Sequence, residues 1–482
     1  MDTIATEPLS DAAKRWTLIV VCAATAMLML DIAVVNTALS RIAEDLGTGL
    51  SGLQWIVDAY TLTLASVVLT CGVLADRFGR KRLFVIGLVL FTLTSGACAA
   101  AGDIVFLDVA RAAQGVGAAI LFATALAILA DAFPARRERA GGLAVYGATI
   151  GASFALGPLV GGALTTGLDW QWIFLINLPL GAACLWITLR KVRESRDPAT
   201  PPVDWPGQAA LIGGLFLLVL ALLHGNEDGW GSATILAELA GAGLLLVAFV
   251  LIEMRSTHPM LPLRFFRNPS FTGAQIAALG ISASIFAVFL YVTLYLQQIL
   301  GLTAIETGLV YLPTTIVVFI VSGATSSLGE RFAARWMVSV GLGLVAVGMA
   351  WMTVSGVSSS WTVLLPGMVV SGVGMGLFNP AVIAVALASV PLENSGLAAG
   401  VNDTFRQAGT AIGVAGLGAL VPADAALGGG SPQAYVDGMH NALLVGAGLA
   451  AVCAVVAGFL IGRVPREPEL NLPGERELAR VG

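Results

Sequence analysis

Apolar runs long enough to cross a membrane follow one another along most of the chain, and short polar stretches separate them. A membrane-spanning helix needs about 20 mostly apolar residues. Fourteen stretches fit this requirement, at residues 16–39, 53–75, 83–101, 104–130, 141–166, 171–190, 206–224, 233–253, 271–300, 308–328, 334–354, 361–389, 397–420 and 440–462. The pattern therefore predicts an all-α polytopic membrane protein with fourteen spans.

Composition gives the same fold class and removes several functional classes. Of the 482 residues, 57% are hydrophobic and only 11% are charged, and the mean hydropathy is +0.88. Soluble domains are far more polar than this. The five cysteines lie singly within apolar runs and the three histidines lie far apart, so we expect neither a disulfide framework nor a metal site.

The basic residues are distributed very unevenly between the two sides of the predicted bundle. If the N-terminus is cytoplasmic, 22 of the 25 Lys and Arg residues fall in cytoplasmic segments. Only Arg41 then lies outside, while Arg111 and Arg406 lie within spans. Cytoplasmic loops carry such an excess of positive charge. We therefore expect both the N- and C-termini in the cytoplasm.

Internal repetition divides the chain into two related halves. The sequence at residues 75–81 recurs in altered form at 329–335, an offset of 254 residues. Gly115-Val116-Gly117 recurs at residues 372–374, an offset of 257. Spans 1–6 thus correspond to spans 9–14, which is the arrangement of a parallel repeat in transporters. We expect an N-terminal six-helix bundle at 1–190, a linker with two additional transmembrane helices at 191–260, and a C-terminal six-helix bundle with a cytoplasmic tail at 261–482.

The charged loop between the second and third spans has a distinctive residue order. From Gly72 to Arg82 it reads Gly-Val-Leu-Ala-Asp-Arg-Phe-Gly-Arg-Lys-Arg, and it resembles the signature loop of the major facilitator superfamily. Other stretches are similar to one branch of that superfamily, the fourteen-spanner drug:proton antiporters; they lie at 30–39, 55–60, 111–118, 157–162, 172–179 and 402–409. The resemblance implies a major facilitator fold of two six-helix bundles plus two additional central transmembrane helices (14 TM), and multidrug or antibiotic efflux.

Two groups of residues are expected to control conformation rather than to bind substrate. In the signature loop, the acid can face a helix N-terminus while the arginines pair across the halves, which would form a breakable latch. In the fifth span, glycines permit close helix contact and a proline introduces a bend. The resemblance implies that this second element is characteristic of exporters. The candidates are Gly72, Asp76, Arg77, Gly79, Arg80, Gly157, Pro158, Gly161 and Gly162.

Three charged residues at similar depth in the outer half of the membrane are candidates for proton coupling. Asp31 lies 15 residues after Trp16, which is roughly 22 Å along a helix. A carboxyl group at that depth is costly unless it is protonated, paired or hydrated. Asp31 is therefore the first choice for the proton carrier; the alternative is a structural aspartate bonded to helix ends.

The other two candidates are Arg111 and Asp58. Arg111 could pair with these acids, and motion of such a pair during transport would change the affinity for protons. The resemblance implies a proton-relay role for this arginine, whereas the alternative is a permanent salt bridge to Asp108 three residues earlier. Asp58 is either a cation-attracting site or a hydrated residue near the outer mouth.

Polar and aromatic residues within the spans are candidates for the substrate cavity. Arg406 is open to two interpretations, an intrahelical pair with Asp403 or a part of the substrate or proton path. The sequence does not tell which helix faces point inward. The candidates are Asn36, Trp55, Tyr60, Gln114, Gln297, Asn379, Asn402, Arg406 and Gln407.

The energy source follows from a missing motif. No lysine stands in the Gly-Lys-Ser/Thr context of a phosphate-binding loop. We therefore expect no cofactor, no nucleic-acid partner and no enzymatic activity, with a proton gradient as the energy source. The favoured function is a monomeric proton-coupled antiporter that exports small lipophilic drugs or antibiotics, monocationic ones included, across the bacterial plasma membrane by alternating access. The alternatives are a proton-coupled uptake symporter of a small metabolite and, less favoured, a passive channel or sensor.

Overall fold

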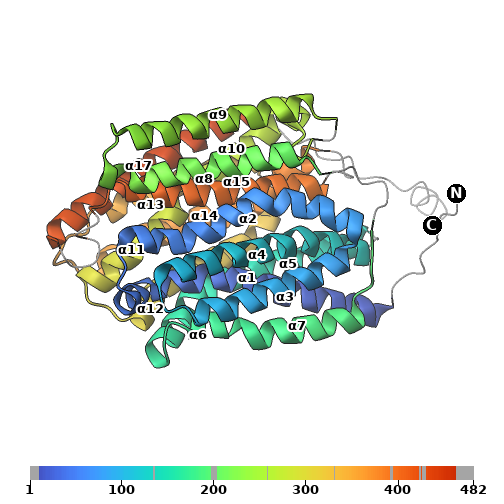
Figure 1. Ribbon diagram of the computed structural model, residues 1–482, viewed down its shortest axis with the longest axis horizontal. Helices are drawn as coiled ribbons and strands as arrows, with labels where there is room; N and C mark the ends of the chain where they lie inside the picture. The colour runs from blue at the N-terminus through green and yellow to red at the C-terminus, as the bar shows by residue number, and fades with distance from the viewer. Residues whose placement is uncertain are drawn as a thin grey trace, which may run out of the picture.

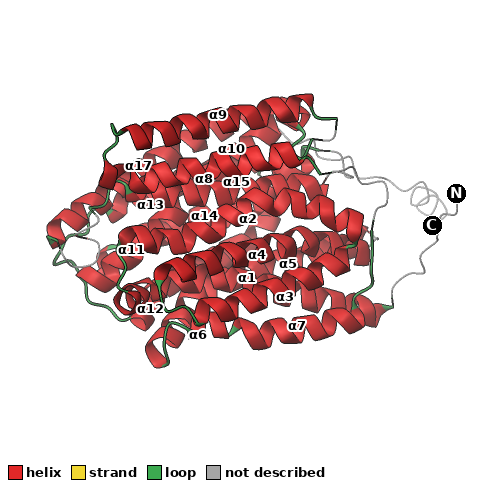
Figure 2. Ribbon diagram, viewed as in Figure 1, coloured by secondary structure: helices red, strands yellow, loops and turns green. Residues whose placement is uncertain are grey.

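The protein is a bundle of long helices that run nearly parallel to the longest axis of the molecule (Figure 1). The computed structural model describes residues 10–133, 136–196, 203–257, 259–329, 332–390, 395–422, 425 and 430–462. These residues form helices and connecting loops, without a β-strand in the described ranges (Figure 2). We call the end at which α1 begins and α17 ends the terminal end, and the opposite end the distal end.

The helices follow the apolar runs. In the first part of the chain they are α1 (Asp11–Leu46), α2 (Leu50–Phe78), α3 (Arg80–Ala99), α4 (Ile104–Ala132), α5 (Arg136–Gly167), α6 (Trp172–Leu175) and α7 (Asn177–Lys191). The inserted pair is α8 (Trp205–Asp228) and α9 (Ala233–Arg255). The second part contains η1 (Leu263–Arg267), α10 (Pro269–Ile281), η2 (Ser282–Phe286), α11 (Ala287–Leu294), η3 (Tyr295–Ile299), α12 (Ala304–Gly329), α13 (Ala334–Met352), η4 (Trp361–Val363), α14 (Leu365–Ala388), α15 (Ser395–Gly418) and α17 (Pro432–Leu460).

Local sequence signals set several helix ends. The Ser10 hydroxyl accepts a hydrogen bond from the Ala13 amide at the start of α1, and the Asp103 carboxylate does the same for Phe106 at the start of α4. α1 ends at Gly47, which has a φ of 62°. Such a left-handed conformation is natural for glycine and stops the helix.

Twelve helices of the described part are long and apolar enough to cross a membrane. The predicted all-α membrane fold is therefore confirmed. α5 and α15 have comparable lengths, 32 and 24 residues, but are not among the twelve. α5 begins with a charged turn, and α15 carries several polar residues in its middle. The number of fourteen spans stays a prediction.

The two parts of the chain pack in corresponding ways. α4 packs against α2 and α3, as α14 packs against α12 and α13. α5 lies along α1, and α15 lies along the α10–η2–α11 segment. The halves pack together mainly in two places: α5 packs against α12, and α15 packs against α2. The chain divisions predicted at 190 and 260 agree with this arrangement but remain our proposal.

Close backbone contacts at glycines recur in both halves. A Cβ atom on Gly115 would collide with the backbone oxygen of Tyr60, and one on Gly372 would lie 3.0 Å from the backbone oxygen of Thr314. These residues are related by the offsets of 257 and 254 seen in the sequence. Two further contacts of the first half recur in the second at the same offsets. The contact of Gly117 with Phe91 corresponds to that of Gly374 with Val345. The contact of Gly87 with Leu121 corresponds to that of Gly341 with Phe378. Small residues thus fix the same helix spacing twice.

The inserted pair lies on one side of the bundle. α8 packs against α9 and also contacts α2 and α15, so it covers one of the two places where the halves meet. In Figure 1, α9 lies at the top edge of the bundle, with α8 directly below it. Within an apolar 18-residue stretch of α9, only 17% of the residues are buried inside the protein. Its remaining surface is suited to lipid.

Candidate functional site

A buried ion pair lies inside the first half. The Arg111 guanidinium on α4 donates a hydrogen bond to the Asp31 carboxylate on α1, with Nη1 and Oδ2 2.6 Å apart. The exposed fraction of the side chain is 2% for Arg111 and 0% for Asp31. The structure thus brings together two residues that the sequence places 80 positions apart. The alternative partner, Asp108, is not bonded to Arg111: its Oδ1 is buried and has no hydrogen-bond partner among the described residues.

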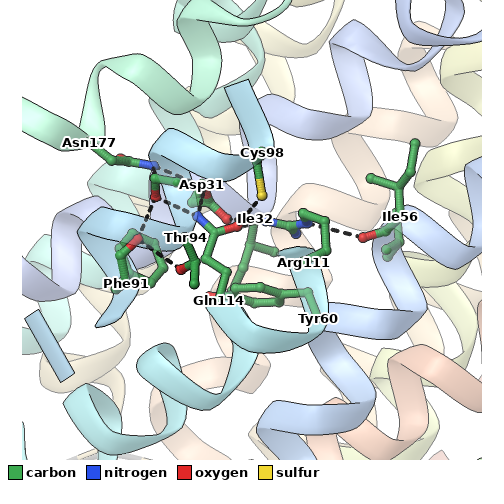
Figure 3. Close-up of polar contacts among 12 residues, drawn as sticks. Asp31, Ile32, Ile56, Tyr60, Phe91, Thr94, Cys98, Arg111, Gln114 and Asn177 are labelled. Atoms are coloured by element: carbon green, nitrogen blue, oxygen red, sulfur yellow. Dashed lines mark hydrogen bonds and ion pairs between the residues drawn. The ribbon is translucent and has the colours of Figure 1, made fainter. Parts of the chain in front are cut away.

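Three polar side chains complete the network around this pair (Figure 3). Gln114 accepts from Arg111 at 2.6 Å and donates to Asp31 Oδ1 at 2.9 Å. Asn177 on α7 donates to the same oxygen at 3.0 Å. Both amides also donate to the Ser95 hydroxyl on α3, at 2.8 and 3.3 Å. Both carboxylate oxygens of Asp31 therefore have hydrogen-bond donors, as a buried polar group requires.

Arg111 is also held against α2. Its Nε donates to the Ile56 backbone oxygen at 3.1 Å, and its guanidinium lies 4.3 Å from the centre of the Tyr60 ring. The centre of the Phe174 ring lies 5.7 Å from the same guanidinium. A guanidinium between two aromatic faces gains cation–π stabilisation in addition to its hydrogen bonds. The site thus links α4 to the two residues that flank Asp58 on α2.

Asp58 is not part of this network. Its exposed fraction is 0%, and neither carboxylate oxygen has a hydrogen-bond partner among the described residues. The reason is helical geometry: a step of two residues is a rotation of about 200°, so Asp58 points away from the face that Ile56 and Tyr60 present to Arg111. Asp58 interacts electrostatically with Tyr291 of the second half instead. It is buried, so the sequence-based alternative of a hydrated residue at the mouth does not fit.

Hydrogen bonds join the two halves near the distal end, one turn beyond Asp58. The Gln54 amide on α2 donates to the Tyr291 hydroxyl at 2.9 Å and to the Val414 backbone oxygen at 3.1 Å. The Tyr291 hydroxyl donates to the same Val414 oxygen. We call these three residues the distal joint. Gln54 precedes Asp58 by four residues, so both lie on the same face of α2.

Two further hydrogen bonds connect the halves at the same end. Gln297 donates from η3 to the Thr37 backbone oxygen of α1 at 3.0 Å. The Ile305 amide of α12 donates to the Thr166 hydroxyl of α5 at 3.2 Å. Gln297, predicted as a cavity residue, therefore bridges the halves. In this conformation the halves are thus joined to each other at the distal end.

The glycines of α5 face two different neighbours. A Cβ on Gly157 would collide with Ala33 of α1, and one on Gly161 would collide with Thr37. Gly162 instead lies against the Ala304 backbone of α12, while Gly308 of α12 lies against the backbone oxygen of Pro158. α5 is therefore a wedge between the first half and α12. Small contact surfaces on both sides suit a helix that shifts between two packings.

In the signature loop, the ion pair stays within the first half. Arg80 Nε lies 2.8 Å from Asp76 Oδ1, one helical turn earlier. The Glu194 carboxylate accepts from the backbone amides of Lys81 and Arg82 at 3.0 and 3.2 Å and so caps α3. The predicted latch across the halves is thus not formed by Asp76 and Arg80 in this conformation. Its formation in another conformation remains our proposal.

The remaining signature-loop glycines and arginine have distinct surroundings. Gly79 has a φ of 114°, and a Cβ there would lie 2.7 Å from Glu194 Oε1. Only glycine suits both the backbone and this close approach. Gly72 has open space around its missing side chain. Arg77 is exposed and lies over the Phe78 ring at 5.7 Å.

Polar residues of α15 face the first half in the middle of the bundle. Asp403 and Arg406 are partly exposed, and they are not within ion-pair distance of each other in the described structure. The Arg406 guanidinium lies 5.9 Å from the Phe286 ring instead. The two side chains thus form no direct ion pair here, although their charges interact electrostatically within α15.

Asp403 lies on α15, which packs against α2 of the first half. It interacts electrostatically with Tyr60 of α2 and Tyr146 of α5. One Asp403 oxygen and the Tyr60 hydroxyl are buried and lack a hydrogen-bond partner among the described residues. An unused donor on α2 and an unused acceptor on α15 thus belong to two helices that pack together between the halves. Such groups suit a polar or charged ligand group.

The other predicted cavity residues are dispersed. Trp55 packs against Phe216 of the inserted helix α8, with ring centres 6.0 Å apart, and so lies outside the central region. Gln114 and Tyr60 belong to the Arg111 network. The rest are placed as follows: Asn36 donates to the Ile32 oxygen in its own helix, Asn402 donates to Gln275 at 3.1 Å, Asn379 has a buried oxygen without a partner among the described residues, and Gln407 is 9% exposed.

Several residues of the site were not assigned a role from the sequence. Asn177 and Gln54 lie in or beside stretches that carry the family resemblance, but nothing in the sequence showed that their side chains bond to Asp31 or to the second half. Tyr291 lies in an apolar run, where a tyrosine is unremarkable. Its polar end is a signal, because a buried hydroxyl in a membrane helix needs a partner.

The fold and the buried charges define a membrane transporter built from two related halves. The Major Facilitator Superfamily model matches residues 21–414 and 324–481, so the chain belongs to this superfamily. It is therefore a transporter rather than an enzyme, and a multi-pass protein of the cell membrane.

The chain is similar to several exporters of drugs and antibiotics. It is 36% identical to the multidrug resistance protein Stp of Mycobacterium tuberculosis over 82% of this chain and 74% of that protein. It is 35% identical to the puromycin resistance protein pur8 of Streptomyces alboniger over 94% and 92%. It is 33% identical to the methylenomycin A resistance protein of Streptomyces coelicolor over 82% and 83%. The predicted resemblance to drug efflux members of the superfamily is thereby confirmed.

Solved structures share the fold at much lower identity. A peptide transporter POT in complex with sulfate has a TM-score of 0.66 and 18% identity, and the match covers 92% of this chain and 95% of that one. The human organic anion transporter TETRAN gives a TM-score of 0.62 and 14% identity over 92% and 99%. At such identities the likeness concerns the fold alone.

Proposed function

We propose that this protein is a proton-coupled antiporter that exports lipophilic drugs or antibiotics, neutral or monocationic, by alternating access. The observation that carries the proposal is Asp58, a fully buried carboxyl group without a hydrogen-bond partner among the described residues, directly beneath the distal joint. An ionised carboxylate in such a place would be very costly. The group is therefore neutral when the distal joint is closed.

This arrangement makes closure of the distal end depend on a proton. When the distal joint is open, water reaches Asp58 and the group can ionise. The joint can close over Asp58 only after a proton binds, because closure removes the water that stabilises the charge. We take the distal end as extracellular, since 22 of the 25 basic residues then lie on the cytoplasmic side. Each closure would thus take up one proton from the outside. Net import then requires that Asp58 release this proton to the cytoplasm, when water reaches it from the terminal end, before the distal joint opens again.

Asp31 and Arg111 have a different role in this account. Asp31 was the first choice for the proton carrier from the sequence, but here it accepts hydrogen bonds from three side chains, one of them the Arg111 guanidinium. Arg111 is bound to α2 at Ile56 and Tyr60. Movement of α2 during transport therefore changes the position of Arg111 relative to Asp31. The pair senses the conformation, and it can take part in proton transfer only when that movement separates it.

The substrate site lies where α15 faces Tyr60 and Tyr146. Asp403 provides a carboxylate for a positive group, while the two aromatic rings provide apolar and cation–π contacts. One acid on this helix suits a single positive charge. Neutral compounds can bind to the same rings with their polar groups on the tyrosine hydroxyls.

A transport assay with an imposed pH gradient tests the proposal. Puromycin is a suitable first compound because a relative is named for resistance to it. In proteoliposomes with cytoplasmic faces outward, wild-type protein should accumulate puromycin inside when the interior is acidic. Accumulation driven by the opposite gradient would favour uptake symport, and gradient-independent equilibration would favour a passive channel. A resistance panel in a pump-deficient host would extend the substrate range.

A further inference from the structure

The inserted helix α8 is bonded to α2 by polar groups inside the membrane region. The Gln208 side chain is only 4% exposed. Its amide donates to the Ser66 backbone oxygen at 2.7 Å, and its carbonyl accepts from the Thr70 hydroxyl. A glutamine in this position must keep such partners, because lipid offers none. Separation of α8 from α2 would leave buried donors and acceptors unpaired.

Further contacts extend this attachment in both directions. Near the distal end, Phe216 of α8 packs against Trp55 of α2. Near the terminal end, the Thr70 hydroxyl also contacts the Met260 sulfur, at 3.2 Å. The segment after α9 is thus joined to α2 as well. Its Leu261 amide donates to the buried Glu253 carboxylate of α9 at 3.1 Å, which holds this segment to the inserted pair.

The contact of α8 with the second half is apolar, in contrast to its hydrogen bonds with α2. Leu222 of α8 lies against Gly416 of α15, 4.0 Å from the position of a Cβ atom there. An aliphatic side chain over a glycine forms a smooth contact that leaves no polar group unpaired when it moves. α8 can therefore move over α15 more easily than it can leave α2.

We propose that α8 and α9, with the segment up to Leu261, form a rigid part of the first half and move with it during transport. The connection to the second half then lies at Pro262, because the following helix η1 is packed on α10: the Phe265 and Phe266 rings lie 5.7 and 5.3 Å from the Phe271 ring. α8 covers the place where α2 meets α15. The cover stays on α2 while α15 moves beneath it, so this side of the transporter remains shielded from lipid throughout the cycle. The proposal concerns relative motion and does not depend on which substrate or ion is transported.

Distances between spin labels test this directly in the full-length protein in nanodiscs. Leu189 on α7, Trp205 on α8 and Trp336 on α13 all lie near the terminal end and are 54%, 62% and 55% exposed. Each pair of these positions is replaced by cysteine in a background without the five native cysteines. Measurements at acidic and alkaline pH, and in a Gln54→Ala variant that weakens the distal joint, sample different conformations.

The expected result is that the Leu189–Trp336 and Trp205–Trp336 distances change together, while the Leu189–Trp205 distance stays constant. A constant Trp205–Trp336 distance with a changing Leu189–Trp205 distance would assign the inserted pair to the second half. Changes in all three distances would make it an independent body, and no change at any pair would contradict motion between the halves. Each of these results would overturn the proposal.

A variant at Gln208 tests the cause of the attachment. Gln208→Leu removes both hydrogen bonds and keeps the apolar volume, so the Leu189–Trp205 distance distribution should become at least twofold wider. Ile212→Ala is the matched control, because Ile212 lies one turn further along α8 and is 39% exposed. It should leave the distribution unchanged. Equal widths in wild type and Gln208→Leu would overturn the role of Gln208.

Discussion

The two halves share their helix spacing but differ in what fills it. The offset of 257 that relates Gly115 to Gly372 also relates Arg111 to Met368 and Gln114 to Ser371. In the first half, Arg111 is the centre of a hydrogen-bonded ion pair. In the second half, Met368 is 4% exposed and lies in an apolar core. Helices with the same spacing therefore enclose an ion pair in the first half and a methionine in the second.

The difference extends to the neighbouring helices. The offset of 254 relates Ser95 to Met349, Asp58 to Leu312 and Tyr60 to Thr314. Apolar residues satisfy the fold at most of these positions, so the packing of the bundle does not require the charges. A buried ion pair is in general no more stabilising than apolar residues of similar size. The charges of the first half are therefore not required by packing, which is consistent with the role in proton coupling that we propose for them.

The largest effect is expected when Arg111 is replaced by methionine, the residue at the corresponding position of the second half. Arg111→Met leaves Asp31 without its positive partner in a buried place, which should lower the free energy of unfolding by about 3–5 kcal/mol. It should also abolish pH-driven transport. Thermal unfolding of the purified protein and flux in proteoliposomes measure both effects. The control is Met368→Leu, for which we expect a loss below about 1.5 kcal/mol.

The double variant sharpens this result. Asp31→Asn combined with Arg111→Met removes both charges, so it should be more stable than Arg111→Met alone, although still inactive in pH-driven transport. Their coupling energy follows from a double-mutant cycle. If the stability effects of the two substitutions were strictly additive, the pair would not act as a unit.

The next effect concerns the dependence of the distal joint on protons. Wild type should favour the closed distal end at acidic pH, where Asp58 is neutral, and should lose this preference as the pH rises and the group ionises. Asp58→Asn cannot ionise, so its conformational equilibrium should not respond to pH, and its transport should no longer follow the pH gradient. Labels across the distal end report the equilibrium. Glu44→Gln, at an acid near the distal end of α1 whose side chain is 59% exposed, is the control and should keep the wild-type response.

A smaller effect should distinguish the two related glycines. Gly115→Ala places a methyl group in collision with Tyr60, whereas Gly372→Ala places it 3.0 Å from the Thr314 oxygen. Overpacking in a tight core costs about 1–3 kcal/mol, and we expect the cost at Gly115 to be the larger. Thermal unfolding compares the two variants. Equal destabilisation would mean that the halves tolerate strain alike.

The smallest effect is expected at the surface of the second half that faces the first. Asp403→Asn should weaken binding of a monocationic compound about tenfold, or about 1.4 kcal/mol, and leave binding of a neutral compound almost unchanged. Asp403→Glu keeps the charge and is the matched control. Binding can be followed by intrinsic fluorescence in detergent. A similar loss for both compounds would point to a structural role.

The sequence was sufficient for the fold class but less so for the helix ends. Apolar runs predicted the span at 104–130, and α4 extends from Ile104 to Ala132. They missed the first two turns of α17, which begins at Pro432 rather than at 440, because a helix continues beyond its apolar part when its polar residues face water or protein. The predicted span at 171–190 is divided into α6 and α7.

The candidate site was predictable in part, for a similar physical reason. A charge in a membrane helix has few possible partners, so depth alone suggested that Arg111 and Asp31 could meet. The depth of a residue in the membrane does not tell how its helix is rotated about the helix axis. This rotation is the reason that Asp58 points away from Arg111. Nor could the sequence show that Gln54 and Tyr291 meet, because they lie 237 residues apart in different halves.

The most direct test of the account is the coupling of flux to the pH gradient in wild type and in Asp58→Asn, measured in the same proteoliposome preparation. The account predicts that wild type accumulates puromycin against its gradient when the interior is acidic, and that Asp58→Asn only exchanges internal for external puromycin without accumulation. Accumulation by Asp58→Asn at the wild-type level would contradict it.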